Sequence, residues 1–176
     1  LIDLASAYDL LQGSGLLSET EKQQIVDGLL LPAIQVVSLN DLGVHNIQIW
    51  HNTAMFLAGL HAKDYIRARQ TLRGATGLEA QFAQGVQADG IWWENSPGYH
   101  FNTIRGMLPM IQAVKRTSLQ VDISPLETMM TAVFDLKLPD HTLPLINDGA
   151  REGYLSGLRD EYEQVVNLFP NSMRLD

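Results

Sequence analysis

The sequence predicts an all-α fold, and three observations lead to that prediction. Apolar residues recur every three to four positions along most of the chain, which is the spacing of one face of an α-helix. Residues typical of helix starts precede several of these segments. Strand signals are weak, because no hairpin dipeptide lies between alternating runs and only residues 121–123 have β character. We therefore expect antiparallel helices joined by loops, although periodicity alone does not distinguish a bundle, a solenoid and a toroid.

The first half of the chain shows helical spacing over residues 1–12, 18–37, 46–60 and 63–84. Ser18 and Glu21 have the form of a capping box, which satisfies free backbone N–H groups where a helix begins. Pro32 lies within the second segment and predicts a kink, because proline lacks an N–H and crowds the carbonyl four residues back. Residues 38–43 are expected to form a loop before the third helix.

The second half shows helical spacing over residues 101–117, 125–134 and 154–169. Ser124 is a typical cap, and Pro125 suits the first turn of the helix that follows. Two long polar loops, at 89–101 and 138–149, separate these helices. No linker of low complexity divides the chain into domains.

Composition excludes several classes of protein. The chain has 176 residues, 45% of them hydrophobic, so it has the means to bury a substantial core. Its formal net charge of -8 argues against a broad basic face for nucleic acid, although a local basic cluster would still attract a small polyanion at short range. The absence of cysteine rules out disulfides and zinc-thiolate sites, and no segment approaches the ~18 apolar residues of a membrane span.

Metal and nucleotide chemistry find no support in the sequence. His45, His51 and His61 do not have metal-ligand spacing, and no H-E-x-x-H motif is present. The stretch GATGLEAQ, at residues 74–81, lacks the lysine and the preceding strand of a phosphate loop, and no G-x-S-x-G motif occurs. We therefore predict no metal and no cofactor.

Polar and aromatic residues concentrate at two helix starts, at 45–52 and in the loop 89–101. In an antiparallel array, helix starts two elements apart lie at the same end, because the intervening helix at 63–84 carries the chain away and back. The two clusters are therefore expected to face each other.

Each of these residues also has a structural interpretation. Asn46 is a good N-cap residue, and Tyr99 with His100 suits a hydrogen-bonded helix start. Tryptophan is more often buried than exposed, but Trp92 and Trp93 are adjacent and cannot both bury on one face, so one of them should be exposed.

The stretch NIQIWHNTAMFLAGL (46–60), followed by DGIWWENSPGYHF (89–101) and LPDHTLPLINDG (138–149), resembles the helical domain of heparinase II/III-like polysaccharide lyases. That group includes heparin and heparan lyases and several alginate and oligoalginate lyases. In it, an Asn or His at a helix start precedes a LAG-type segment, which Asn46 matches, and a D-G-x-x-x-E-x-S-x-x-Y-H loop supplies a tyrosine, which Tyr99 matches. The remaining loop positions are filled by Asp89, Gly90, Glu94, Ser96 and His100.

The third stretch is similar to the family's P-D-G-x-x-P-x-x-G-D loop. Pro139, Asp140 and Pro144 fit it, His141 stands where glycine is usual, and residues 147–148 vary its ending. The resemblance implies an incomplete α/α toroid followed by a β-sandwich that supplies further catalytic residues, usually including a histidine. The chain is still helical in character at Asp176, so we expect residues 1–176 to be a toroid fragment of a larger lyase, inactive alone, with the sandwich outside it.

The activity that the resemblance implies is β-elimination on a uronic acid. Asn46 would neutralise the substrate carboxylate, because an amide donates hydrogen bonds without titrating. Tyr99 would transfer a proton, as the acid and, if nearby cations depress its pKa, also as the base. His100 is the third catalytic candidate, through orienting the tyrosine or binding the carboxylate. Substrate-binding candidates are His51, Trp92, Trp93, Glu94 and Arg105.

The implied partner is an anionic polysaccharide or oligosaccharide, in a periplasmic or secreted protein, with the missing C-terminal domain as the other half of the site. The chain begins with Leu1 in a helical segment, so we expect an upstream part to have been removed, and the lack of a signal peptide here is uninformative. Two alternatives stay open: a non-catalytic helical module that binds saccharide or protein, and a toroid glycoside hydrolase. The hydrolase would need two acids, and Asp89 with Glu94 is the available pair in the loop.

Overall fold

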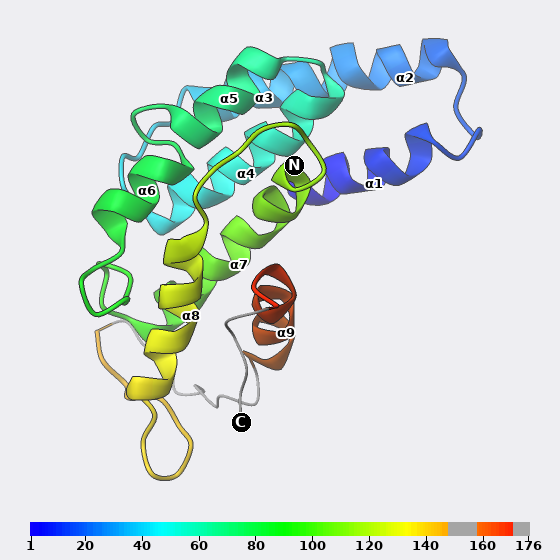
Figure 1. Ribbon diagram of the computed structural model, residues 1–176. Helices are drawn as coiled ribbons and strands as arrows, with labels where there is room; N and C mark the ends of the chain where they lie inside the picture. The colour runs from blue at the N-terminus through cyan, green and yellow to red at the C-terminus, as the bar shows by residue number, and fades with distance from the viewer. Residues whose placement is uncertain (148–157, 171–176) are drawn as a thin grey trace.

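The computed structural model describes residues 1–147 and 158–170, and these residues are all-α, with no β-strand among them (Figure 1). The helices are α1 (Ile2–Gln12), α2 (Glu19–Ile25), α3 (Leu31–Ser38), α4 (Asn46–His61), α5 (Tyr65–Arg73), α6 (Leu78–Gly85), α7 (Pro97–Val114), α8 (Ser124–Asp135) and α9 (Arg159–Leu168). A π-helical turn, η1 (Val26–Leu30), joins α2 to α3. The prediction of an all-α chain of antiparallel hairpins is confirmed.

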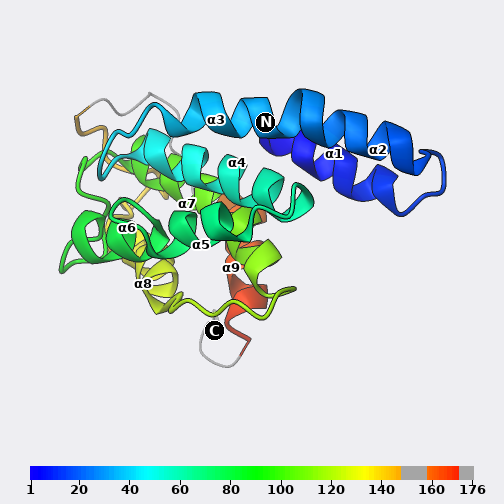
Figure 2. The same ribbon diagram turned by 90° about the horizontal axis from the view of Figure 1, so that it is seen from above.

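Helices α4 and α7 form the centre of the molecule. They pack against each other and begin at the same end, while α1, α3 and α5 lie against α4, and α8 and α9 lie against α7 (Figures 1 and 2). The two central helices approach closely at Gly106, where a Cβ atom would lie 3.0 Å from both Ile49 and the Trp50 ring. The Thr53 hydroxyl donates to the Gly106 carbonyl oxygen at 2.6 Å. This contact holds α4 against α7 midway along both helices.

The start of the second predicted helix is confirmed, and its irregularity takes an unexpected form. Ser18 and Glu21 form the complete capping box at the beginning of α2. Pro32 falls in the first turn of α3, directly after η1, in which the N–H of Leu31 donates to the Val26 carbonyl five residues back. Pro32 has no N–H to donate to the carbonyl four residues back. In the preceding π turn the hydrogen bond runs to the fifth residue back instead, so the helix continues past the proline.

The single helix predicted for residues 63–84 is wrong, because the chain forms α5 and α6 with a tight turn between them. Gly74 and Gly77 make this turn possible. A Cβ atom at Gly74 would lie 2.5 Å from the Gln70 carbonyl oxygen, and one at Gly77 would lie 2.8 Å from the Leu72 carbonyl carbon. Both α5 and α6 pack on α4, so the apolar spacing continues across the turn between them. The break is therefore not visible in the periodicity of the sequence.

Other helix boundaries differ by a few residues. Helix α7 begins at Pro97 rather than at 101, since proline is well suited to the first helical turn. Ser124 is the first residue of α8, and Ile123 takes the cap position. Of the last predicted helix, at 154–169, residues 154–157 lie outside the described residues, and α9 covers most of the remainder.

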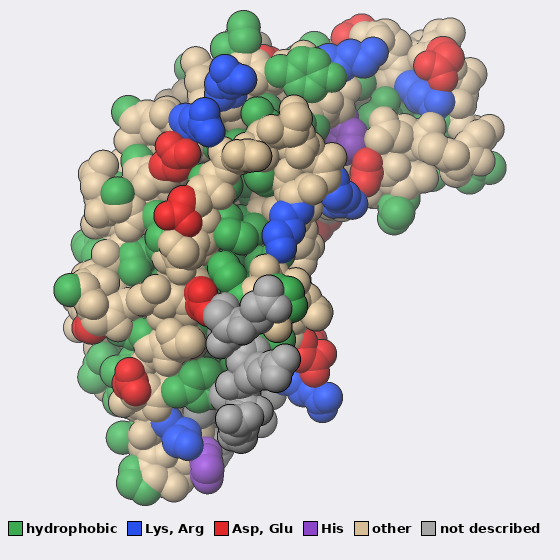
Figure 3. Space-filling view, in the orientation of Figure 1, with side chains coloured by type: hydrophobic (Ala, Val, Ile, Leu, Met, Phe, Trp, Pro, Cys, Tyr) green, Lys and Arg blue, Asp and Glu red, His purple; other side chains and the backbone are tan. Residues whose placement is uncertain are grey.

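The core is one cluster of apolar side chains to which α4, α7 and α8 contribute most members and the other helices add further ones, with Trp92 as its largest fully buried member. Within the described ranges, no helix is both long enough and apolar enough to cross a membrane. The space-filling view shows a curved molecule whose hollowed side lies on the right (Figure 3). The closed ring of a toroid stays an expectation from the sequence.

Candidate active site

The loop before α7 starts with a tight Asp-Gly turn. The Asp89 carboxylate accepts from the backbone N–H of Ile91 at 2.9 Å. Gly90 has a positive φ of 83°, and a Cβ atom there would lie 2.8 Å from Ala132 and 2.9 Å from the Thr128 carbonyl oxygen. Glycine is therefore required both by the backbone conformation and by the contact with α8. The Asp89 carboxylate therefore serves the turn.

The two adjacent tryptophans have opposite environments. Trp92 is fully buried, while Trp93 is 42% exposed, which confirms that one of the pair faces solvent. The Trp92 indole packs on Gly85 at the end of α6, where a Cβ atom would lie only 2.2 Å from the ring. Trp93 donates its backbone N–H to the Gly85 carbonyl oxygen at 2.8 Å. In this structure Trp92 has no surface with which to contact a sugar, so only Trp93 retains that possibility.

His100 connects the loop to α8. Its Nδ1 accepts from the backbone N–H of Trp92 at 3.0 Å, so the ring proton lies on Nε2, which donates to the Met129 carbonyl oxygen at 3.0 Å. Burial lowers the pKa of His100 to about 4, because the charged ring would lose its hydration, although the hydrogen bond to Met129 partly opposes this. The imidazole is therefore neutral, and both nitrogens are occupied in holding the loop.

Glu94 joins the loop to the start of α4. Its Oε1 accepts from the Asn46 side-chain amide at 3.0 Å, and its Oε2 accepts from the Trp92 indole N–H at 2.6 Å. Because a carboxylate only accepts, the nitrogen of the Asn46 amide must face Glu94. The two clusters predicted to face each other are thus joined by a direct hydrogen bond across 48 positions of sequence.

Asn46 is not the N-cap of α4. His45 takes that position, with its Nδ1 accepting from the N–H of Ile47. Asn46 is the first residue of the helix and is 96% buried, with an exposed fraction of 4%. Its side chain is therefore not needed for capping, and one N–H of the amide is directed by Glu94 while the second is available to another acceptor.

Tyr99 lies in the first turn of α7, directly before His100. It is 37% exposed, in contrast to the buried Pro97 and His100 in the same helical turn. The Thr103 hydroxyl donates to the Tyr99 backbone carbonyl, which ties down the main chain at this position. The phenol is thus presented to solvent from a rigid helix start.

The third motif stretch docks onto the same loop. The Asn147 side chain donates to the backbone carbonyls of Glu94 at 3.2 Å and Asn95 at 2.9 Å. His141, which stands where the family usually has glycine, has a positive φ of 64°, a conformation that glycine adopts without cost. The three resembling stretches therefore meet in space, apart from residues 148–149, which lie outside the described part of the chain.

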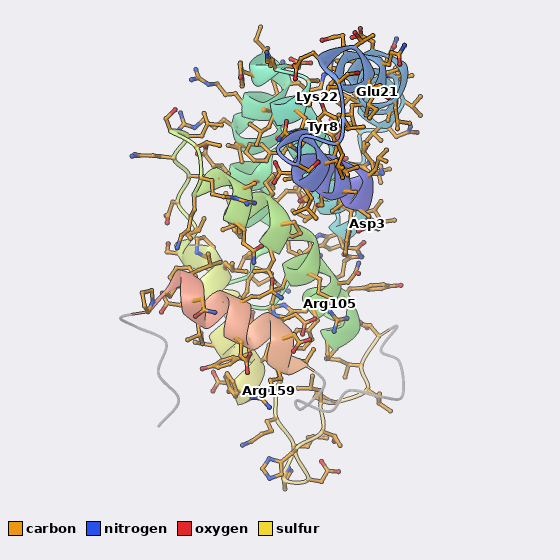
Figure 4. The ribbon with its side chains drawn as sticks, turned by 90° about the vertical axis from the view of Figure 1, so that its right-hand side faces the viewer. Asp3, Tyr8, Glu21, Lys22, Arg105 and Arg159 are labelled. Atoms are coloured by element: carbon orange, nitrogen blue, oxygen red, sulfur yellow. The ribbon has the colours of Figure 1, made fainter. Side chains whose placement is uncertain are left out.

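Two of the predicted substrate-binding residues lie elsewhere. Arg105 forms an ion pair with Glu161 of α9, between the two helices (Figure 4). His51 is half-buried, and its Nδ1 lies 3.2 Å from the Asn40 carbonyl oxygen in the loop before α4. Neither residue is brought to Asn46 or Tyr99 by a contact among the described residues.

A group of buried amides beneath the site did not emerge from the sequence. Gln48 donates to Asn52, which donates to the Thr76 carbonyl oxygen, and Gln81 donates to the carbonyls of Gly43 and Thr76. These amides hold the loop before α4 to the turn between α5 and α6. The available signal was the spacing of Gln48 and Asn52, four apart on an otherwise apolar helix, since buried polar residues need partners.

Over the described ranges, no group of three or more His, Cys, Asp or Glu residues is arranged to hold a metal ion. The site therefore provides an amide donor, a carboxylate that orients this amide, an exposed phenol and an exposed indole.

The sequence of this chain matches that of a known protein family. The family described as Heparinase II/III N-terminus matches residues 41–176, which contain all three stretches. A heparin-sulfate lyase of Pedobacter heparinus is 33% identical over 91 residues, covering 49% of this chain and 14% of the relative, so the chain spans a small part of that protein. No solved structure shows a significant match. The chain belongs to the heparinase II/III N-terminus family.

Proposed function

We propose that the chain contributes half of the active site of a polysaccharide lyase that cleaves uronic-acid-containing chains by β-elimination. The observation that carries this proposal is the hydrogen bond between Asn46 and Glu94, which connects an amide donor on α4 to the loop leading into Tyr99. The heparin-sulfate lyase among its relatives supports a sulfated or carboxylated substrate.

In β-elimination, the C5 proton of the uronic acid is removed, the bond from C4 to the glycosidic oxygen breaks, and a C4–C5 double bond forms. The C5 proton becomes acidic enough only if the negative charge that develops on the adjacent carboxylate is stabilised. The free N–H of the Asn46 amide suits this task, because a pre-oriented donor needs no reorganisation as charge develops. Glu94 and the buried start of α4 supply that orientation.

Tyr99 is the proposed proton-transfer residue. Its phenol is exposed and carried by a helix start that Thr103 and His100 hold in place. The phenol would return a proton to the departing glycosidic oxygen, and as a phenolate it would accept the C5 proton. Trp93, exposed in the same loop, offers a flat apolar face to the sugar ring. His100 acts as a positioning residue, since its two nitrogens are occupied.

The hydrolase alternative is less well supported. It requires two carboxylates free for acid and base chemistry. Asp89 accepts from the backbone of its own turn, and both oxygens of Glu94 accept from fixed donors. Neither carboxylate is thus free to act on a substrate.

The test uses the full-length protein and follows the ultraviolet absorbance of the unsaturated product on heparan sulfate and alginate. We expect product from the wild type on at least one polymer. Asn46→Ala and Tyr99→Phe should each lower kcat by about 100-fold or more, as expected for loss of an oxyanion donor and of a proton-transfer group.

The matched controls are Asn167→Ala and Tyr162→Phe, which alter the same residue types on α9 and should leave kcat unchanged. If no uronate polymer yields an unsaturated product, the protein is not a lyase, and the non-catalytic binding module becomes the better hypothesis. Full activity of Tyr99→Phe would remove the role given to that phenol alone.

A further inference from the structure

Basic residues gather far from Asn46, at the other end of α4 and α7. Six of the twelve Lys and Arg residues of this acidic chain fall at positions 63–73 and 115–116. These positions lie in the turn from α4 to α5, along α5, and just after α7. Figure 3 shows Lys and Arg side chains over α5 and the adjoining end of the array.

Two hollows open at this end and share part of their lining. The larger, of about 720 Å³, lies between α5 and residues 117–119, and the smaller, of about 580 Å³, lies between α1 and the ends of α4 and α7. Leu60, Tyr65 and Thr117 line both, so the hollows adjoin each other. We refer to the two together as the basic groove.

The charge in the basic groove is strongly one-sided. The lining includes the cations Lys63, Arg69 and Arg116, together with Arg73, which is paired with Glu79, against Asp9 as the single carboxylate among the lining residues. Lys63, Arg69 and Arg116 are exposed, and none of them forms an ion pair with any residue in the described part of the chain. Cations that are held close together and left without partners attract an anion at short range despite a net charge of -8.

An exposed aromatic residue stands where the two hollows meet. Tyr65 is 62% exposed in the first turn of α5, and its neighbour Ile66 is 77% exposed. The exposed ring of Tyr65 offers an apolar face, and the Lys and Arg side chains of the groove offer charged donors near it. That combination suits a saccharide ring bearing carboxylate or sulfate groups, because guanidinium groups pair with both anions and the ring covers the apolar sugar face.

We infer that the basic groove is a second binding site for an anionic saccharide chain, which holds a stretch of the polymer that is not being cleaved. Asn46 and His61 are the ends of the 16-residue helix α4, so the end of the groove at His61 and Lys63 lies roughly 24 Å from Asn46 along the helix axis, while α5 carries the rest of the groove back along α4. A short oligosaccharide held at Asn46 therefore does not reach the far end of the groove, whereas a long chain does. The inference rests on the proposed function only for the kind of saccharide.

Binding is tested with the full-length protein carrying Asn46→Ala, so that cleavage does not interfere. Fluorescently labelled unfractionated heparin is the probe, and Arg69→Ala/Arg116→Ala is compared with Lys137→Ala/Arg159→Ala, which removes the same charge outside the groove. We expect the groove variant to bind heparin about tenfold more weakly and the control to bind it as before. Tyr65→Ala should also weaken binding, at unchanged charge.

A second measurement separates this inference from the lyase proposal. In the otherwise wild-type protein, the groove variant should raise KM for long heparin chains and leave cleavage of a heparin tetrasaccharide unchanged. If the groove variant binds heparin as tightly as its control, the inference is overturned whether or not the protein is a lyase. If no polymer is cleaved and the groove variant still loses heparin binding, the inference stands and the lyase proposal fails. An equal loss of binding to a DNA strand, with no effect of Tyr65→Ala on heparin, would overturn the assignment to saccharide.

Discussion

The carboxylate of Glu94 accepts from two fixed donors, the Asn46 amide and the Trp92 indole. Asn147 adds two further bonds to the backbone at the same place. One residue thus connects the amide proposed to meet the substrate, the buried anchor of the loop and the third motif stretch. In the structure its carboxylate orients the Asn46 amide and the Trp92 indole, and its grouping with the substrate-binding residues stays a prediction.

Glu94→Gln tests this role without changing size. Glutamine offers one acceptor oxygen and one NH₂ group, so either Asn46 or Trp92 would face another donor. We expect the free energy of unfolding to fall by roughly 1–3 kcal/mol, the cost of a buried donor without a partner. The measurement is urea unfolding of the full-length protein.

Glu163→Gln is the matched control, because Glu163 pairs with Arg159 on the exposed face of α9. Its effect should stay within about 0.5 kcal/mol, as is usual for exposed ion pairs. Equal unfolding curves for the two variants would show that Glu94 contributes no more to the free energy of unfolding than an exposed ion pair does.

The contacts of individual residues were only partly open to prediction. Asn46 and Tyr99 stood out because motif resemblance depends on residue type and spacing, which are visible in a sequence. The burial of Trp92 and the pairing of His100 with Met129 depend on α8 packing over the loop, a contact between segments 29 positions apart. Local sequence cannot report such a contact.

Among the helices, α6 determines where the active-site loop lies, because its last residue, Gly85, supports the Trp92 ring. Gly85→Ala would place a methyl group inside the indole and push the loop away. We expect a loss of roughly 1–3 kcal/mol in the free energy of unfolding, typical of overpacking, together with a reduction of the proposed lyase activity. Thermal unfolding and the product assay measure the two effects.

Gly28→Ala provides the comparison, since nothing lies within 4 Å of a Cβ atom at Gly28, in η1. Alanine is favoured over glycine in helices by up to about 1 kcal/mol, so this variant should be neutral or slightly more stable. A Gly85→Ala protein as stable and active as Gly28→Ala would contradict the proposed support of the loop.

Helix existence was predictable where apolar spacing is regular, as in α1, α4 and α7. The break between α5 and α6 was missed because its glycines are needed for close backbone contacts, which leave the apolar spacing undisturbed. The early start of α7 was missed because proline both ends and begins helices, and only the packing of the first turn decides between them.

Acid should destabilise the molecule as a whole through His100. The unfolded imidazole has its ordinary pKa of 6.5, whereas burial lowers the folded pKa to about 4, so the unfolded state binds the proton more tightly. Stability is therefore fully present above pH 6.5 and is lost as the pH falls from there toward 4, by roughly 3 kcal/mol in total. The half-buried His61, whose pKa burial also lowers, acts in the same direction.

His100→Gln separates the two histidines, because glutamine keeps an acceptor and a donor but cannot be protonated. The variant should be less stable than the wild type at pH 7, and its stability should fall less between pH 6.5 and 4. Urea midpoints across this range give the comparison. Parallel pH profiles for the two proteins would mean that His100 does not titrate as its burial requires.

The arrangement of the whole chain was predictable in outline only. Antiparallel hairpins follow from short connections between helices, and they brought the starts of α4 and α7 to one end as expected. The basic groove could not be foreseen, because its residues come from α1, α4, α5 and the segment after α7, and no periodic pattern connects them.

The bonds that build the candidate site close long loops: Asn46 meets Glu94 across 48 positions, and Asn147 meets Glu94 across 53. Helical turns and neighbouring hairpins form through local contacts and tend to do so early, whereas contacts of this separation must await the docking of α4 against α7. Partial opening of that contact would disconnect Asn46 from the loop while every helix stayed intact. Activity should therefore vanish on mild heating before the helical circular dichroism signal changes, so that catalysis reports on docking and helicity does not.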